Sequence, residues 1–430
     1  MKNDIYEIRN RLDRVDLDVL HNIYLFRCLT IRQIYNNFYA KSINTFNKFL
    51  DKKLNELLSY GVVEEVYFNK DNVALFLTKI GIEVVREAFD LPVNIVDHQK
   101  KVVKRGYYRA SELKMLPRLI PHQVHLNQFV LDFKKVFNHR GLPMVWKYFD
   151  EKYVSQYINI RPDGLIRLLD TDFFLEMDMN TESKAQLIEK WKHYRAFLTS
   201  REYKYNEKKI IVLFIIENTS NIENRKNIVR MTASEILLDI IDGDFEIIVG
   251  SKEELLRKIF NNLIPNILQT NYKVETLKNI LTTKHEFSIA DGTNLKSKLN
   301  NAEYGYYIRK VDEHNNVVVE QRRIQEYLLD YYCGDSLSVI NKIAYLQTNS
   351  STFKYYFNRD ISYIVVCDDL KAMYADLEMF DLQGEDCVYY TTIERLNKYP
   401  FSQAICQFDN LGRPFSFKDN SLSLRSYLNE

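Results

Sequence analysis

Three carboxylates in one short segment have the residue types and spacing of a metal-dependent hydrolase. Pro162-Asp163 stands before an expected β-hairpin, and Glu176 and Asp178 end its second strand. Residues two apart in a strand share one face, so these last two carboxylates point the same way. Metal-dependent hydrolysis of a phosphodiester needs oxygen ligands from adjacent strands, which let Mg²⁺ bridge the scissile phosphate and a water. The segment therefore predicts a candidate Mg²⁺ site formed by Asp163, Glu176 and Asp178.

The same carboxylates allow two interpretations without catalysis. They can form a solvated strand edge that binds no metal, or a vestigial site that holds a cation or DNA without cutting it. Their order resembles the PD-(D/E)xK nuclease fold, but that pattern has lysine, which activates water, where this chain has Asp178. A helix expected at 181–199 can supply the lysine instead. The candidate lysines of this helix are Lys184, Lys190 and Lys192. Lys190 and Tyr194 are four residues apart and share one face of the helix. This pair is weakly similar to the helical motif that contacts DNA in RecB-like members of the fold.

The first 90 residues carry the pattern of a winged helix-turn-helix domain. Apolar residues at helical spacing predict helices over residues 16–26, after the N-cap Thr30, and over residues 42–59. Gly61 follows where a left-handed residue ends a helix. Two short strands around the turn NKDN form a hairpin, and TKIGIEVVREAF returns to helix. This order leaves the outer face of the third helix free for the major groove of DNA.

Polar side chains occupy that outer face and suit base edges and phosphates. The expected DNA contacts are Asn44, Thr45, Asn47, Lys48, Asp51 and Lys52, with Lys70 added by the wing turn. A winged helix can also dock proteins through a solvated polar face, and this alternative stays open.

Residues 91–120 are expected to form a basic linker, because the periodicity fades there. Its basic residues stand beside Tyr107 and Tyr108, and such a run can follow a phosphate backbone. The candidates for DNA contact are Lys100, Lys101, Lys104 and Arg105. The run can equally be a solvated connector.

Two further α/β domains are expected, over residues 121–265 and 266–430. A helix at 121–138, strands near 144–149, 158–169 and 172–178, and alternating helices and strands up to residue 250 predict a mixed sheet flanked by helices. The resemblance of its carboxylates to the PD-(D/E)xK pattern implies that this sheet is restriction-endonuclease-like. The last third repeats this theme as a degenerate copy, with a hairpin and then a helix within residues 306–332. In that copy Tyr307-Ile308-Arg309 corresponds to Leu165-Ile166-Arg167, Glu320 stands near the position of Glu176, and Gly305 replaces Asp163. The expected fold class is thus multi-domain α/β.

Charge and composition restrict the function classes. Residues 1–150 hold 24 Lys and Arg against 17 Asp and Glu, a net +7; the totals of 59 and 58 leave 35 and 41 for the remainder, a net −6. A basic front end favours a polyanionic partner. The sequence has neither a signal-peptide pattern nor an apolar run of membrane-spanning length, which predicts a cytoplasmic protein. Its five cysteines lack paired spacing and are expected to be buried free thiols.

Several short motifs resemble the replication-relaxation family of plasmids and other mobile elements over roughly residues 10–255. They are Leu77-Thr78-x-x-Gly81, His122 with Asn127, Pro162-Asp163, and Phe174-Leu175-Glu176-Met177-Asp178 followed by Thr-Glu-Ser. The resemblance implies a DNA-binding protein of plasmid replication or conjugative relaxation, with a nuclease-like second domain whose activity is not assured in the family.

The first functional hypothesis is therefore a protein that binds double-stranded DNA, with an inactive nuclease-like domain as scaffold. Replication or relaxase proteins would bind its C-terminal domain, a homodimer is conceivable, and no membrane partner is expected. The first alternative is a Mg²⁺-dependent endonuclease that uses Asp163 and Glu176. The second is a transcription regulator whose α/β domains sense a ligand. No cofactor other than Mg²⁺ is expected.

Overall fold

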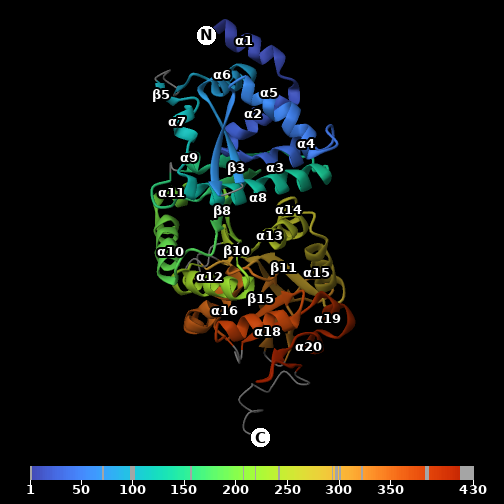
Figure 1. The fold of residues 1–430 in the computed structure, drawn as a ribbon. Helices are drawn as coiled ribbons and strands as arrows, with labels where there is room; N and C mark the ends of the chain where they lie inside the picture. The colour runs from blue at the N-terminus through green and yellow to red at the C-terminus, as the bar shows by residue number, and fades with distance from the viewer. Residues whose placement is uncertain are drawn as a thin grey trace. The chain divides into compact units, whose positions relative to one another are not determined.

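The chain has the expected mixed α/β structure (Figure 1). It forms two compact units. The computed structural model describes residues 2–69, 72–96, 102–154, 157–206, 208–217, 219–240, 243–292, 294–295, 299, 302–320, 323–382 and 387–416. The first unit holds residues 1–156 and 162–166, and the second holds residues 157–161 and 167–430. The sequence pattern instead places boundaries after residues 90, 120 and 265.

Helices and a three-stranded sheet open the first unit. The helical segments are α1 (Lys2–Arg11), α2 (Arg14–Phe26), α3 (Ile31–Ile34) with η1 (Tyr35–Tyr39), α4 (Phe46–Phe49) with η2 (Leu50–Leu54) and α5 (Asn55–Ser59), and α6 (Lys79–Ala88). The strands β1 (Leu29–Thr30), β2 (Val63–Asn69) and β3 (Asn72–Leu77) pair antiparallel in the order β1-β3-β2. Thr30 caps α3 and Gly61 has a φ of +63°, so the expected order of helices and hairpin is confirmed.

The third helix begins later than predicted. Thr45 is its N-cap, since the Thr45 side chain accepts a hydrogen bond from the Lys48 N–H at 3.3 Å. Asn44 and Thr45 therefore precede the helix and do not lie on its outer face. Ile43 extended the apolar stripe in the sequence, but a threonine that satisfies a free N–H sets the start of the helix.

The buried carboxylate of Asp16 ties the three helices together. It accepts hydrogen bonds from the Tyr39 hydroxyl at 2.5 Å and from the Lys53 ammonium at 2.9 Å. Tyr39 lies in η1 and Lys53 in η2, the π-helical turns of the second and third helices. Burial lowers the pKa of Lys53, but the hydrogen bonds and charges of Asp16 and Asp13 outweigh it and raise the pKa above its usual value. The third helix is therefore fixed to α2 by a charged contact.

Residues 91–120, expected as a linker, contain regular elements of the first unit. The strands β4 (Asn94–Val96) and β5 (Val102–Arg105) pair antiparallel, and α7 (Ala110–Leu113) and η3 (Pro117–Leu119) follow. The unit continues with α8 (Ile120–His139), β6 (Trp146–Asp150) and α9 (Glu151–Val154). The predicted helix at 121–138 is thus confirmed.

The first part of the second unit is a parallel sheet with helical connections. The strands β8 (Thr171–Asp178), β9 (Lys209–Ile216) and β10 (Phe245–Ser251) are parallel in the order β10-β9-β8, and β7 (Gly164–Leu168) precedes them. The helices are α10 (Lys184–Thr199), α11 (Arg201–Lys204), α12 (Ile222–Leu237), α13 (Lys252–Lys258) with η4 (Ile259–Leu263), and α14 (Ile264–Ile267). The indole N–H of the buried Trp191 donates to the Thr232 hydroxyl at 3.1 Å, which joins α10 to α12.

The last part of the second unit has its own five-stranded sheet, in the order β11-β12-β15-β16-β17. Its strands are β11 (Phe287–Asp291), β12 (Tyr306–Lys310), β15 (Glu326–Tyr332), β16 (Ser362–Cys367) and β17 (Val388–Thr391). Its helices are α15 (Tyr272–Thr283), α16 (Ser338–Thr348), α17 (Ser350–Phe357), α18 (Leu370–Met379), α19 (Ile393–Lys398) and α20 (Phe401–Ala404). Two short antiparallel strand pairs are added by β13 (Val319–Glu320) with β14 (Arg323–Ile324), and by β18 (Gln407–Phe408) with β19 (Pro414–Phe415).

The helix predicted before residue 332 is wrong, because that segment is the strand β15. It pairs antiparallel with β12 and parallel with β16, and its Leu328 and Leu329 are both buried. A strand covered on both faces has a continuous apolar pattern that resembles a buried helix in sequence.

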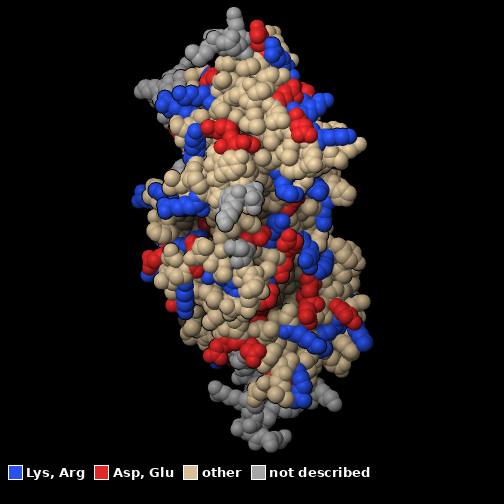
Figure 2. Space-filling model, in the orientation of Figure 1, with Lys and Arg blue, Asp and Glu red and all other residues tan. Residues whose placement is uncertain are grey.

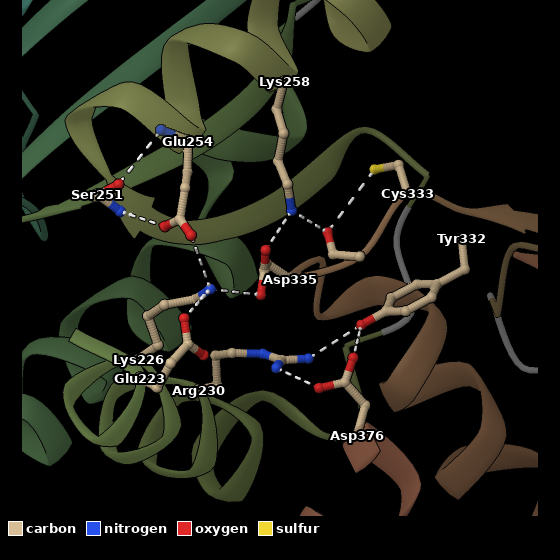
Figure 3. A network of polar contacts seen from close by, with 11 residues as sticks. Glu223, Lys226, Arg230, Ser251, Glu254, Lys258, Tyr332, Cys333, Asp335 and Asp376 are labelled. Atoms are coloured by element: carbon tan, nitrogen blue, oxygen red, sulfur yellow. Dashed lines mark hydrogen bonds and ion pairs between the residues drawn. The ribbon is translucent and has the colours of Figure 1, made fainter. Parts of the chain in front are cut away.

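A charged network joins the two parts of the second unit around α12 (Figure 3). The Asp335 carboxylate accepts from Lys258 at 2.6 Å and from Lys226 at 3.0 Å. One turn farther along α12, Arg230 pairs with Asp376 of α18 at 2.5 Å and donates to the Tyr332 hydroxyl at 3.1 Å. Lys226 and Arg230 are buried, so their charges depend on these partners.

Candidate functional site

Glu176 and Lys190, both predicted site residues, lie in direct contact. One Glu176 carboxylate oxygen accepts from the Lys190 ammonium at 3.0 Å, and the other accepts from the Tyr194 hydroxyl at 2.6 Å. Lys190 and Tyr194 lie one turn apart on α10, whose N-terminus is set by the cap Ser183. Lys190 also pairs with Glu182 at 3.1 Å. The helix after the strand therefore places a lysine against the Glu176 carboxylate.

Asp178 has a different partner, the guanidinium of Arg225 on α12. Two hydrogen bonds join them, at 2.5 and 3.0 Å, and the backbone N–H of Asn180 donates to the same carboxylate at 2.9 Å. Both charged side chains are buried. A bidentate pair of this kind uses the lone pairs that a metal ion would need. Asp178 and Glu176 are thus close in sequence, but their carboxylates bind side chains of different helices, α12 and α10.

Arg225 is the residue that the sequence reasoning missed. It lies 47 positions after Asp178, and no local pattern connects the two. A signal was nevertheless present, since Arg225 shares the inward face of α12 with the buried Val229 and Thr232. A cation on the apolar face of a helix needs a buried anion nearby.

Asp163 lies immediately before β7 and groups with the first unit, whereas Glu176, Asp178 and Lys190 group with the second. Its carboxylate is 3.3 Å from His122 Nε2, in the first turn of α8. Asn127, the other motif residue of this helix, donates from its carboxamide to the backbone carbonyls of Phe26 and Cys28 at 3.1 and 2.6 Å. Asn127 therefore holds α8 against the end of α2.

Within the described parts of the chain, no group of three or more His, Cys, Asp and Glu side chains is arranged to hold a metal ion. The described helices include none that is both long enough and apolar enough to span a membrane. All five cysteines are free, as predicted, but only Cys28, Cys367 and Cys406 are buried, and Cys333 and Cys387 are partly exposed.

The side chains proposed to contact DNA are solvent-exposed. Asn47, Lys48 and Lys52 lie on the outer side of the third helix, and Asn44 and Thr45 lie just before it. Lys53, by contrast, turns inward to Asp13 and Asp16. The outer surface of the helix thus offers carboxamide, hydroxyl and ammonium groups.

The remaining basic candidates are only partly described. Lys70, Lys100 and Lys101 lie outside the described residues, and Lys104 lies in β5. Arg105 pairs with Glu112 at 2.7 Å and lies over the Tyr107 ring at 5.7 Å. Arg105 is therefore partly neutralised within the first unit.

Comparison with known protein families gives a match. Residues 20–213 match the model of the replication-relaxation family, which confirms the resemblance found in the motifs. The match runs from within α2 into β9 and includes Asp163, Glu176, Asp178 and Lys190. No curated protein and no solved structure matches the chain. Over residues 20–213 the chain is thus similar to the replication-relaxation family.

Proposed function

We propose that the protein binds double-stranded DNA through its third helix, residues 46–59, in the replication or relaxation of a plasmid or another mobile element. In this proposal the opening helices and hairpin form a winged helix-turn-helix domain. The family match over residues 20–213 supports the role in replication or relaxation. The observation that carries the DNA contact is the exposed row Asn47, Lys48 and Lys52 on a helix whose opposite side is buried.

The way the third helix is held supports this function. Phe49, Leu54 and Leu57 are buried, and Lys53 is fixed to Asp16 on α2. A helix held from behind presents its outer side chains in a constant geometry, which base recognition requires. Asn and Lys side chains match adenine edges, guanine edges and phosphates.

The nuclease-like part of the second unit is proposed as a scaffold that does not cut. Arg225 neutralises Asp178, and both carboxylate oxygens of Glu176 already accept hydrogen bonds. A metal ion would have to displace these partners in a buried site, at the cost of leaving a cation unpaired.

The double substitution Asn47→Ala, Lys48→Ala should weaken binding to the protein's own DNA site by about 1–3 kcal/mol for each base that the helix can no longer hydrogen-bond. Removal of the Lys48 ammonium should also reduce the salt dependence of binding by about one released counterion. The measurement is a titration of a plasmid-origin fragment at several salt concentrations, with footprinting of the bound site.

The matched control is Asn397→Ala, Lys398→Ala. These two residues are also adjacent, exposed and helical, but they lie on α19 of the second unit. Their replacement should leave affinity and footprint unchanged. If the Asn47, Lys48 variant instead bound with the wild-type affinity and footprint, the third helix would not be the DNA contact.

A metal-dependent endonuclease is the second candidate function. The observation that favours it is the 3.0 Å contact of Lys190 with Glu176, because PD-(D/E)xK nucleases need a lysine beside this carboxylate. If the domain is only a scaffold, the protein should leave supercoiled plasmid intact in the presence of Mg²⁺ or Mn²⁺. Nicking that is abolished in Glu176→Gln and Lys190→Met, but kept in Lys192→Met on the exposed side of the same helix, would establish the nuclease instead.

A further inference from the structure

The two parts of the second unit have the same succession of elements. The strands β8, β9 and β10 are parallel neighbours connected by α10 and α12, and β15, β16 and β17 are parallel neighbours connected by α16, α17 and α18. A strand also precedes each parallel set along the chain: β7, of which Arg167 and Leu168 belong to the second unit, and β12. The last part is therefore laid out as a second copy of the first.

An arginine–carboxylate contact aligns the two copies. Arg167 of β7 donates to Asp172 of β8 at 2.7 Å, and Arg309 of β12 lies 3.6 Å from Glu326 of β15. In each copy the arginine is the fourth residue of its strand. Counting four residues onward from each carboxylate places Asp330 opposite Glu176, so Glu320 is not its counterpart.

The counterpart of Asp163, four residues before the arginine, is Gly305. Its backbone N–H donates to Asp330 at 3.0 Å, and a Cβ at Gly305 would lie 2.8 Å from the same carboxylate oxygen. Asp330 also accepts from Lys342 at 2.8 Å and from the Tyr363 hydroxyl at 3.0 Å. The second copy thus keeps a buried carboxylate–lysine pair, and it has a glycine at the sequence position that corresponds to Asp163.

A pocket of about 620 Å³ lies over this pair, within the size range of about 300–1,000 Å³ that is usual for small-ligand sites. Gly305, Asp330 and Lys342 line it together with residues of β9, β10, α14 and α15. Figure 2 shows acidic and basic side chains mixed over α13, α14 and α15. Charged and polar side chains also line the pocket itself, among them Lys209, Asn262 and Glu303, so its ligand must satisfy specific hydrogen-bonding groups.

The carboxylates of the pocket wall are already paired. Asp330 has the three partners named above, Glu246 accepts from the N–H groups of Leu337 and Ser338 at 3.1 Å, and Glu303 accepts from the Gly243 N–H at 2.6 Å. Paired carboxylates have little remaining capacity to bind a cation. The acidic side chains therefore do not decide which ligand the pocket takes.

The pocket side chains that have no described hydrogen-bond partner are mainly hydrogen-bond donors. No described residue pairs with the ammonium of the exposed Lys209, and the carboxamides of Asn262 and Gln269 have no described partner either. Tyr306, Ile248 and Val339 add apolar surface beside them. An ammonium suits a phosphate, carboxamides suit the edge of a base, and the apolar surface suits a planar ring.

We propose that this pocket, built on the degenerate second copy of the nuclease-like site, binds a nucleoside monophosphate without cleaving it. Lys209 contacts the phosphate, and Asn262 contacts the base. The inference is independent of the proposed DNA contact of the third helix, because every residue of the pocket lies in the second unit.

The test is calorimetric titration of AMP, GMP, CMP and UMP, and of inorganic phosphate, into the full-length protein. At least one nucleotide should bind with one-to-one stoichiometry, and phosphate alone should bind at least tenfold more weakly. Loss of one charge-assisted hydrogen bond in Lys209→Ala should weaken nucleotide binding by about tenfold or more. Asn262→Ala should change the preference among the four bases.

The control is Lys371→Ala, which removes an exposed lysine of α18 outside the pocket. It should bind the nucleotide as the wild type does. The proposal is overturned if none of the four nucleotides gives a saturable signal, or if Lys209→Ala binds with wild-type affinity while its circular dichroism shows a folded protein.

Discussion

Replacing Arg225 with methionine should lower the free energy of unfolding of the second unit by about 3–5 kcal/mol. The reason is that Asp178 is buried and fully enclosed, so removal of the guanidinium leaves a carboxylate without its counter-charge. Asp178→Asn should also be destabilising, because it leaves the buried Arg225 guanidinium without its counter-charge, although the amide oxygen keeps one acceptor for it.

The double variant Asp178→Leu, Arg225→Met separates charge from packing. Replacement of a complete buried ion pair by apolar residues is often neutral or stabilising, so this variant should recover most of the stability that Arg225→Met removes. Arg195→Met is the exposed control, since Arg195 also forms a bidentate pair, with Asp239, but both side chains are solvent-exposed. Its cost should stay below about 1 kcal/mol.

Trp191 reports the unfolding of this region. It is one of two tryptophans, is fully buried, and joins α10 to α12 through Thr232. Urea unfolding followed by fluorescence in a Trp146→Phe background therefore follows the contact between the two helices. An Arg225→Met protein with the unfolding midpoint of the wild type would mean that Asp178 is free, and thus available to a ligand.

Local sequence patterns were sufficient to predict much of the secondary structure of the first unit. Thr30 and Gly61 mark helix ends by chemistry that operates within a few residues, and the hairpin of β2 and β3 follows from two short apolar strands around a polar turn. The predicted start of the third helix was wrong by a few residues, because Ile43 continues the apolar stripe to the N-terminal side of the capping Thr45. Periodicity reports which side faces the core, whereas capping sets where the helix begins.

Contacts between distant residues explain what the sequence could not reveal about the candidate site. Glu176 with Lys190 was predictable, since a helix follows its strand after a short turn and returns over it. The pairing of Asp178 with Arg225 was not predictable in the same way, because Arg225 lies on α12, which follows α10 and α11 in the chain. The correspondence of Asp330 with Glu176 depends on recognising β15 as a strand. Its alternation was obscured because both faces are covered.

Asp335→Asn should destabilise the second unit by about 3 kcal/mol at neutral pH. The carboxylate of Asp335 neutralises both Lys226 and Lys258, and Lys226 is buried (Figure 3). Asp335 has a φ of +52°, a left-handed conformation that asparagine tolerates, so this substitution removes the charge without adding backbone strain. The control Asp368→Asn removes a carboxylate that pairs with the exposed Lys273, and its cost should be below about 1 kcal/mol.

The pH dependence of the Asp335 effect has a definite sign. Burial raises the pKa of Asp335, but the charges of Lys258 and Lys226 outweigh it and hold the pKa below its ordinary value. A carboxyl group whose folded pKa is depressed contributes stability above its unfolded pKa and loses it as the pH falls through the folded value. The difference in stability between wild type and Asp335→Asn should therefore be constant from about pH 5 to 8 and shrink below about pH 4. A difference that grew on acidification would mean that the lysines are not paired with a charged Asp335, and that the network around α12 is held by the remaining partners, Glu254 and Asp376.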